Sequence, residues 1–443
     1  MLPILHQSYW RDEAFSVLLA SKSLKEIFFL TAKDVNPPFY YFLLHFWIKL
    51  FGDAEFITRS FSLLFLFLLA LSSFFLLRQL IKDWRISLLG SLAILLNPFL
   101  FEYGFEARSY VLFGFLTVTA ILFYLKRKYL LSSLFLGLMV FTHNFGVFFL
   151  IALLAFWFFE NRENLKKRIL HFSSLFIFPI LVFLGWLQMF WNQWTKVAEG
   201  FWIGPVTSTV FVDTFRFFFR GTKDYPSVAM FYNITLLLVF LACAYWIVKL
   251  ANKEDENDSF NKDASLILVF LFSIPFLIAY FISAFWIPIL HERYLIPILP
   301  FFIIWVTFSL YQLFSFKKIF SNIVLVLVVG YLFFAVQSAE EIVRKTSKPA
   351  INYAAGQITA IAGKNDVVIP ESNLNFLETK YYIQKKRSDV PIYAYSADGK
   401  IPFYIGDVLF EENEIIKEYP KDKQIWIVTP DGGYYLKEVV KTD

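Results

Sequence analysis

Two neighbouring carboxylates, Asp12 and Glu13, stand near the start of the chain, directly after the aromatic pair Tyr9-Trp10. A carboxylate that is partly removed from water can take the proton of a hydroxyl group as a general base. Asp12 and Glu13 are therefore predicted to activate an acceptor hydroxyl. The alternative is that Asp12 only caps a helix beginning at Glu13.

A second polar segment begins at Asp34, and it continues through Asn36 and two prolines to Tyr40. Asn36 followed by Pro37 is typical of a helix start, because asparagine caps helices and proline fits their first position. Gly52 marks the end, so the sequence predicts a helix over 37–51. A helix N-terminus attracts anions, but the two prolines each remove one N–H donor there.

Arg108 stands between Glu106 and Tyr110, immediately before an apolar segment. Its guanidinium could bind a phosphate through two parallel hydrogen bonds. The alternative is an interfacial Glu/Arg pair, with Tyr110 in the aromatic belt of a membrane protein.

His143 and the run His291-Glu292-Arg293-Tyr294 also join apolar segments. A lone histidine in such a place can simply be a satisfied interfacial residue. Three ionisable residues between two apolar segments are costly unless they are paired or hydrated, which favours a site around Arg293. The five histidines are scattered singly, so their spacing predicts no metal site.

The elements that must position these residues are mostly membrane helices. The chain has 443 residues, of which 58% are hydrophobic and 17% charged, and 57 are phenylalanine. A soluble domain contains about 25% charged residues. The net charge of +5 does not indicate a nucleic-acid partner, and the single cysteine, Cys243, says nothing about the redox compartment.

Apolar runs of roughly 18 residues recur, as expected for transmembrane helices. We predict about ten spans, near 55–80, 86–101, 109–125, 129–142, 144–159, 169–191, 231–250, 264–290, 294–314 and 319–337. Alternate loops are rich in Lys and Arg, which predicts that these loops face the cytoplasm. The segment 1–54, the long loop 192–230 and the tail then face outward, together with all the candidate residues above.

The fold class that follows is an α-helical polytopic membrane protein with outward-facing juxtamembrane helices and a small C-terminal α/β domain. Ser23 and Glu26 form a capping box before one such helix, which is predicted to lie in the membrane surface. The predicted parts are a first outer loop over 1–54, a bundle over 55–337 and the extracytoplasmic domain over 338–443. In that domain, a helix near 349–362 and strands near 366–369, 390–395 and 425–429 are expected.

Taken in order, the motifs resemble the GT-C membrane glycosyltransferases, in the branch of the protein O-mannosyltransferases and the lipid A aminoarabinose transferase. The similarity covers roughly residues 9–300. The motifs are Trp10-x-Asp12-Glu13-Ala14, Asp34-x-Asn36-Pro37-Pro38-x-Tyr40-Tyr41, Phe51-Gly52, Arg59-x-x-Ser62, Glu106-Ala107-Arg108-x-Tyr110, Thr142-His143-x-Phe145-Gly146 and Arg293-Tyr294-x-x-Pro297.

The resemblance implies an enzyme of the inner membrane that moves a sugar from a polyprenyl-phosphate carrier to an envelope lipid, glycan or protein on the outer face. Asp12 would be the base, with Glu13 beside it, and no metal or other cofactor is expected. The family often has His or Lys where this chain has Asn36, so Arg108 and Arg293 become the phosphate ligands. The residues expected to bind substrate are Asp34, Asn36, Tyr40, Glu106, Arg108, Tyr110, His143, Glu292, Arg293 and Tyr294.

Two other classes of function remain open. A lipid or glycan transporter would also bury charges, but it tends to have inverted repeats and broken spans near the middle of the membrane. Here the ionisable residues stand at the ends of spans. A non-catalytic envelope-assembly protein is the other alternative. Relatives in the family place a membrane span before the first loop, where this sequence has Met1 to Arg11.

Overall fold

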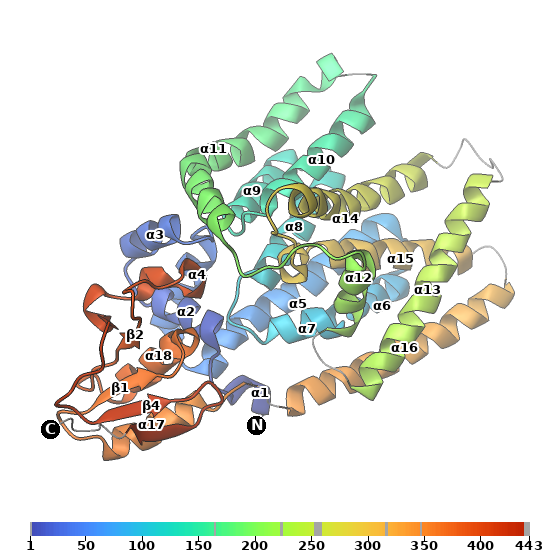
Figure 1. The fold of residues 1–443 in the computed structure, drawn as a ribbon. Coiled ribbons are helices and arrows are strands. Elements are labelled where there is room, and N and C mark those ends of the chain that lie inside the picture. Colours follow the sequence, from blue (N-terminus) through green and yellow to red (C-terminus); the bar gives the residue numbers. More distant parts are fainter. Residues whose placement is uncertain are drawn as a thin grey trace. The chain divides into compact units, whose positions relative to one another are not determined.

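The computed structural model describes residues 2–163, 165–221, 225–251, 259–314, 318–345 and 348–437. The chain divides into two compact units (Figure 1). The mixed unit contains Met1–Phe61, Asn192–Trp202 and Lys345–Asp443, and it has both helices and strands. The helical unit contains Ser62–Trp191 and Ile203–Arg344.

The helical unit is built from helices of 7 to 31 residues, most of them apolar. They are α5 (Glu55–Leu80), whose first turns belong to the mixed unit, α6 (Trp84–Leu95), α7 (Pro98–Gly104), α8 (Tyr110–Leu125), α9 (Tyr129–Val140), α10 (Gly146–Asn161), α11 (Ile169–Glu199), α12 (Val210–Arg220), α13 (Pro226–Ala251), α14 (Ser259–Phe285), α15 (Ile298–Phe314) and α16 (Lys318–Arg344). Neighbours such as α8 and α9, α10 and α14, and α13 and α16 pack against each other.

Every predicted span coincides with a helix or a pair of helices. Among the described residues, five helices are long and apolar enough to cross a membrane: α5, α11, α13, α14 and α16. A sixth crossing is formed if α6 and α7, bent by 62°, act as one span. The remaining four predicted spans, α8, α9, α10 and α15, are apolar helices of fewer than 18 residues. The predicted basic loops around 252–258 and 315–317 lie outside the described residues.

The bend between α6 and α7 has a local cause. Pro98 lacks an N–H donor and disfavours a helical conformation at Asn97, which ends α6. The Asn97 side chain then caps α7 by accepting from the Leu100 N–H at 3.1 Å, and its amide donates to the Phe218 carbonyl of α12 at 3.1 Å. The predicted long loop 192–230 was wrong in part, because α11 continues to Glu199 and α12 follows it.

The first part of the mixed unit consists of short helices: α1 (Pro3–His6), α2 (Arg11–Ala20), α3 (Leu24–Lys33) and α4 (Phe39–Phe51). The capping box of α3 is confirmed, since the Ser23 hydroxyl accepts from the Glu26 N–H at 3.3 Å and Glu26 accepts from the Ser23 N–H at 2.9 Å. Gly52, with φ of 94°, ends α4 as predicted.

Two predicted helix starts were wrong. Helix α4 begins at Phe39 with Pro38 in the capping position, because Pro37 and Pro38 hold the chain before them out of the helical conformation. Helix α2 begins at Arg11, so Asp12 and Glu13 lie in its first turn and Asp12 is not its cap.

The tail forms a small α/β arrangement in which α17 (Ile351–Ile361) and α18 (Phe376–Lys386) lie against a sheet (Figure 1). Strand β4 (Ile425–Val428) is central, parallel to β1 (Val367–Pro370) and antiparallel to β5 (Tyr434–Lys437). The strands β2 (Ala394–Tyr395) and β3 (Ile415–Ile416) form a second parallel pair. The sheet core contains Val367, Ile369, Ile425 and Ile427.

Candidate active site

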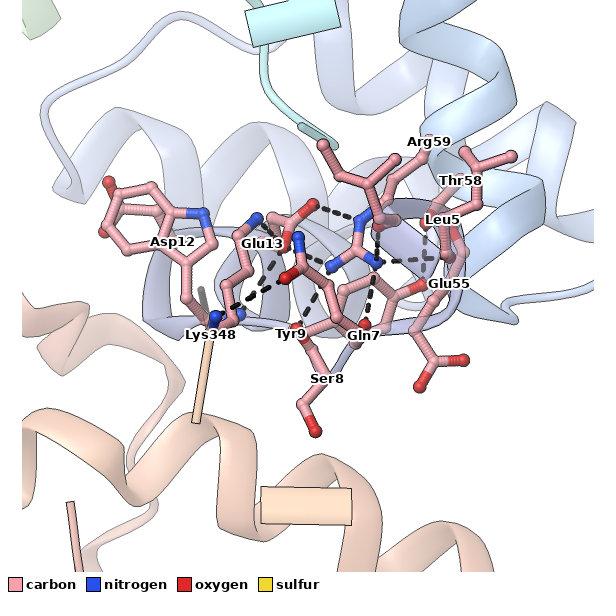
Figure 2. A network of polar contacts seen from close by, with 12 residues as sticks. Leu5, Gln7, Ser8, Tyr9, Asp12, Glu13, Glu55, Thr58, Arg59 and Lys348 are labelled. Carbon is pink, nitrogen blue, oxygen red and sulfur yellow. Dashed lines mark hydrogen bonds and ion pairs between the residues drawn. The ribbon is translucent and has the colours of Figure 1, made fainter. Parts of the chain in front are cut away.

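Arg59, in the second turn of α5, is the centre of the polar network in Figure 2, and its side chain is fully buried. Its Nε and Nη2 donate to the two Glu13 carboxylate oxygens at 2.9 and 2.7 Å. The same guanidinium donates to four backbone carbonyls, at 2.7 to 3.1 Å, from Ile4, Leu5, Gln7 and Ser8. One arginine thus fixes the segment that leads into α2.

Glu13 is fully buried as well, and Lys348 adds a second cation to it at 2.8 Å. Burial by itself would raise the pKa of Glu13, but the charges of Arg59 and Lys348 outweigh it and lower this pKa to about 2. A carboxylate held this way is a poor proton acceptor. We call Glu13, Arg59 and Lys348 the first-loop cluster.

Asp12 differs from its neighbour in exposure, since its side chain keeps 13% of its accessible surface. Its Oδ1 lies 3.2 Å from Nε of Arg11. Of the predicted pair, Asp12 is therefore the carboxylate whose surroundings suit proton transfer, and its role as base stays a prediction.

Asp34, Asn36 and Tyr40 belong to the same unit. Asp34 is buried at the C-terminal end of α3, and an Asn36 amide nitrogen lies 3.5 Å from its Oδ2. Tyr40 is buried in the first turn of α4, where its ring packs on Tyr41 and Phe61. They flank the turn that joins α3 to α4.

In the helical unit, three connections bring five of the predicted residues together. Arg108 and Tyr110 come from the start of α8, His143 from the turn between α9 and α10, and Arg293 and Tyr294 from a 3-10 turn before α15. The Tyr110 ring lies below both guanidinium carbons, at 5.5 Å from Arg108 and 5.8 Å from Arg293. We call these five residues the arginine–aromatic cluster.

His143 is buried in this cluster and stacks on Phe113, with ring centroids 5.0 Å apart and planes within 10°. Burial, and then the charges of Arg108 and Arg293, lower the pKa of His143 to about 3. The ring is therefore neutral at physiological pH. Its Nδ1 accepts the Phe145 N–H at 3.2 Å, so the proton is on Nε2.

Both arginines keep only 8% of their surface exposed, which concentrates positive charge in a small apolar volume. Such a place favours a bound anion, because low polarity strengthens the attraction. The two predicted glutamates adjoin the arginines in the chain. The Glu106 backbone carbonyl accepts the Arg108 N–H at 2.7 Å. Besides burial, the charges of Glu106 and Arg293 act in opposite directions on the pKa of Tyr103. Burial raises the pKa of Glu292, whose carboxylate lies 3.6 Å from Nδ1 of His291.

Sequence reasoning named Arg59 only as part of a motif and did not include Lys348. A single arginine at the start of a long apolar helix is a signal for a buried partner, so Arg59 could have been found. Lys348 had no such signal, because its partner is 335 residues away. No group of three or more possible metal ligands occurs among the described residues.

Comparison with known proteins agrees with this architecture. The family model described as dolichyl-phosphate-mannose-protein mannosyltransferase matches residues 35–186. Two crystal structures of ArnT from Cupriavidus metallidurans, one apo and one bound to undecaprenyl phosphate, are similar over nearly the whole chain, with a TM-score of 0.64 and 12% identity in each case. They cover 96% and 97% of this chain and 90% of ArnT. The chain has a GT-C fold.

The GT-C fold confirms the resemblance inferred from the order of the motifs and the predicted fold class. The family match includes Tyr40, Arg108 and His143, and it ends before Arg293. No curated protein sequence matches the chain.

Proposed function

We propose that this protein is a glycosyltransferase that takes its sugar from a polyprenyl-phosphate donor. The observation that carries the proposal is the arginine–aromatic cluster, where Arg108 and Arg293 meet from separate connections of a GT-C fold. Similarity to ArnT, which has been crystallised with undecaprenyl phosphate, supports a donor of this class.

The cluster suits the phosphate of such a donor. Both guanidinium carbons lie over the Tyr110 ring, at 5.5 and 5.8 Å, and guanidinium groups bind phosphate oxygens through charge-assisted hydrogen bonds. Tyr110 and Tyr294 also supply hydroxyl groups within the arginine–aromatic cluster. As the sugar leaves, the growing negative charge on the phosphate would be stabilised by the arginines, an effect typically of about 3 to 4 kcal/mol for each well-placed donor.

Asp12 is the proposed base. The acceptor oxygen forms a bond to the anomeric carbon of the sugar while the bond from that carbon to the phosphate oxygen breaks. The acceptor proton passes to Asp12, and the electron pair of the broken bond leaves with the polyprenyl phosphate. A single displacement of this kind inverts the anomeric configuration. Asp34, Asn36 and Tyr40 would then line the substrate site beside it.

The reaction would take place on the outer face of the inner membrane, because the basic loops are predicted to be cytoplasmic. The acceptor would be an envelope lipid, glycan or protein with a free hydroxyl. We propose no metal for this chemistry, since neutralising the leaving phosphate falls to Arg108 and Arg293.

The test is transfer by purified protein, with a panel of radiolabelled undecaprenyl-phosphate sugars and an envelope extract as the acceptor. We expect Asp12→Asn to fold and to bind undecaprenyl phosphate but to lose transfer by about 10²- to 10⁴-fold, the usual contribution of a general base. The matched control is Asp422→Asn, an exposed aspartate of the same unit.

Wild-type turnover in Asp12→Asn would overturn the base assignment alone. Absence of any radiolabelled product from the wild-type protein across the panel, with movement of lipid between bilayer leaflets instead, would overturn the enzyme and favour a transporter.

A further inference from the structure

Helix α3 ends at Lys33, and its last turn is capped by side chains of another helix. The carbonyls at the C-terminal end of a helix have no partner within that helix. Asp34 and Val35 follow α3, and neither is the glycine that commonly ends a helix. The Leu30 carbonyl accepts the Asp34 N–H at 2.9 Å. The carbonyls of Thr31 and Lys33 are bound by the end of α11.

The two donors are Gln193 and Lys196, which are three residues apart and therefore lie on one face of α11. The Gln193 amide donates to the Thr31 carbonyl at 2.9 Å, in a buried contact. The Lys196 ammonium donates to the Lys33 carbonyl at 2.8 Å. Both donors belong to the mixed unit, as α3 does. We call Gln193 and Lys196 the α11 cap.

Helix α11 is long enough to reach this turn and still cross a membrane. It has 31 residues and is one of the candidate membrane spans. At 1.5 Å per residue it measures about 46 Å along its axis. The hydrocarbon core of a bilayer is about 30 Å thick. The last turns of α11, which carry the α11 cap, can therefore extend beyond the bilayer.

Lys196 is also held by the C-terminal domain. Its Nζ lies 3.7 Å from Oδ2 of Asp407 and 5.8 Å from the centroid of the Phe403 ring. The Phe403 ring stacks on that of Phe201, which follows α11, with centroids 6.1 Å apart and planes within 12°. The Lys196 side chain is therefore fixed between the end of α3 and the segment 403–407.

The charge of Lys196 suits this place. The C-terminus of a helix carries a partial negative charge, which favours a nearby cation and disfavours an anion. Asp34 is buried in the capping position of α3 and brings a carboxylate to that end. The Lys33 carbonyl that Lys196 binds belongs to the peptide bond leading into Asp34. Lys196 thus restrains the backbone at Asp34 and offsets the negative end of α3.

We propose that Gln193 and Lys196 are positioning residues for transfer: they fix the end of α3 and thereby place Asp34 and Asn36. The Asn36 amide nitrogen lies 3.5 Å from Oδ2 of Asp34, so a displacement of this turn moves both residues. The inference rests on the proposed function, in which Asp34 and Asn36 line the substrate site. It gives the membrane helix α11 a part in the reaction through that turn.

Substitution of Lys196 is the direct test. Lys196→Met keeps an unbranched side chain but removes the N–H donors and the charge. We expect kcat/KM to fall about 10- to 100-fold, because a displacement of about 1 Å in a substrate site has effects of this size. Lys196→Arg keeps a charged donor and should stay within about threefold of wild type.

The matched control is Lys49→Met, which removes an exposed lysine from the last turn of α4 in the same unit. It should transfer at the wild-type rate. Wild-type kcat/KM in Lys196→Met, or equal losses in Lys196→Met and Lys196→Arg, would overturn the inference.

A double substitution separates the positioning of Asp34 from a general loss of structure. If Lys196 acts by placing Asp34, Lys196→Met should lower transfer by less than about twofold in protein that already carries Asp34→Asn. A further loss of the full 10- to 100-fold would show that the two residues act independently and would overturn the inference. If Asp34→Asn has no measurable transfer, hydrogen exchange decides alone.

Amide hydrogen exchange without substrate separates this inference from the proposed function. Residues 34–36 should exchange faster in Lys196→Met and Gln193→Leu than in wild type, and at the wild-type rate in Lys49→Met. If Gln193→Leu does not fold, Lys196→Met suffices. Equal exchange in all the proteins overturns the α11 cap even if transfer is found. Faster exchange in Lys196→Met, with no transfer by wild type, keeps the cap and rejects the glycosyltransferase.

Discussion

The first-loop cluster and the arginine–aromatic cluster both bury arginine beside a tyrosine ring, but they differ in how many cations they bring together. Arg59 is surrounded by oxygen: four carbonyls and both oxygens of Glu13 accept its hydrogen bonds. Arg59 also lies over a ring, that of Tyr9, at 5.4 Å. Arg108 and Arg293 share the ring of Tyr110, at 5.5 and 5.8 Å, and Arg293 lies 5.4 Å from the ring centroid of Tyr294. The first arrangement fixes a backbone, whereas the second brings two cations to one ring.

The difference teaches how to read a buried cation. A guanidinium bound by several carbonyl and carboxylate oxygens fixes the segments that supply those oxygens. Two guanidinium groups that share one ring bring two positive charges together, and guanidinium groups recognise phosphate. The predictions below test this distinction, beginning with the largest effect.

Removal of Arg59 should destabilise the protein most. Arg59→Ala leaves the Glu13 carboxylate buried without its main counter-ion, and breaking such a pair typically costs about 3 to 5 kcal/mol. Thermal unfolding in detergent should show a large fall in the melting temperature of Arg59→Ala. Arg344→Ala, which removes an exposed ion pair with Glu340, should change stability by less than about 1 kcal/mol. Equal melting of both variants would contradict the structural role.

Removal of Arg293 should act mainly on transfer. We expect Arg293→Ala to lower transfer about 10²- to 10³-fold, as for loss of one transition-state donor. Arg293→Lys should recover only part of the activity, because an ammonium lacks the two parallel N–H groups. If Arg293→Ala has a lower melting temperature but transfers sugar at the wild-type rate, Arg293 is structural and does not bind the phosphate.

Acid should destabilise the two units in different pH windows. The pKa of His143 is lowered to about 3, so its stabilising contribution is complete above its unfolded value of 6.5 and is lost as pH falls toward 3. For Glu13, the contribution is complete above 4.5 and is lost as pH falls toward 2. Between pH 6 and 5, wild type should therefore lose up to about 1.4 kcal/mol per pH unit more than His143→Phe does.

Denaturant unfolding of both proteins over that range measures the difference, and phenylalanine keeps the ring that stacks on Phe113. Parallel stability curves would show that His143 is already protonated in the folded state.

The smallest effect is expected for Tyr110→Phe. The Arg108 Nη2 lies 3.4 Å from the Tyr110 hydroxyl, a weak contact, while the ring that supports both arginines is retained. Transfer should fall by no more than about fivefold, equivalent to about 1 kcal/mol. Tyr110→Leu removes the ring and should cost more. If Tyr110→Phe and Tyr110→Leu lower transfer equally, the Tyr110 ring does not orient the arginines.

Much of the fold was predictable because its signals are local. Apolar runs marked the helices of the bundle, and the capping box of Ser23 and Glu26 marked α3. Helix α18 was not predicted, because its buried residues mix polar and charged side chains such as Glu378 and Lys380 with the apolar Phe376, Leu377 and Ile383. Strand β2 is shorter than predicted: the residues before it meet β1 only through an isolated bridge between Ile392 and Val368.

The sequence by itself determined the membrane helices, the GT-C motifs and the residue types at the helix ends, including Arg108, His143 and Arg293. Only the tertiary structure decided which carboxylate of the Asp12-Glu13 pair is bound by two cations. Glu13 meets Arg59 across 46 residues and Lys348 across 335. Hydrophobic periodicity and capping act over a few residues, whereas an ion pair of such separation depends on how distant segments pack. That packing buries Glu13 and leaves Asp12 partly exposed.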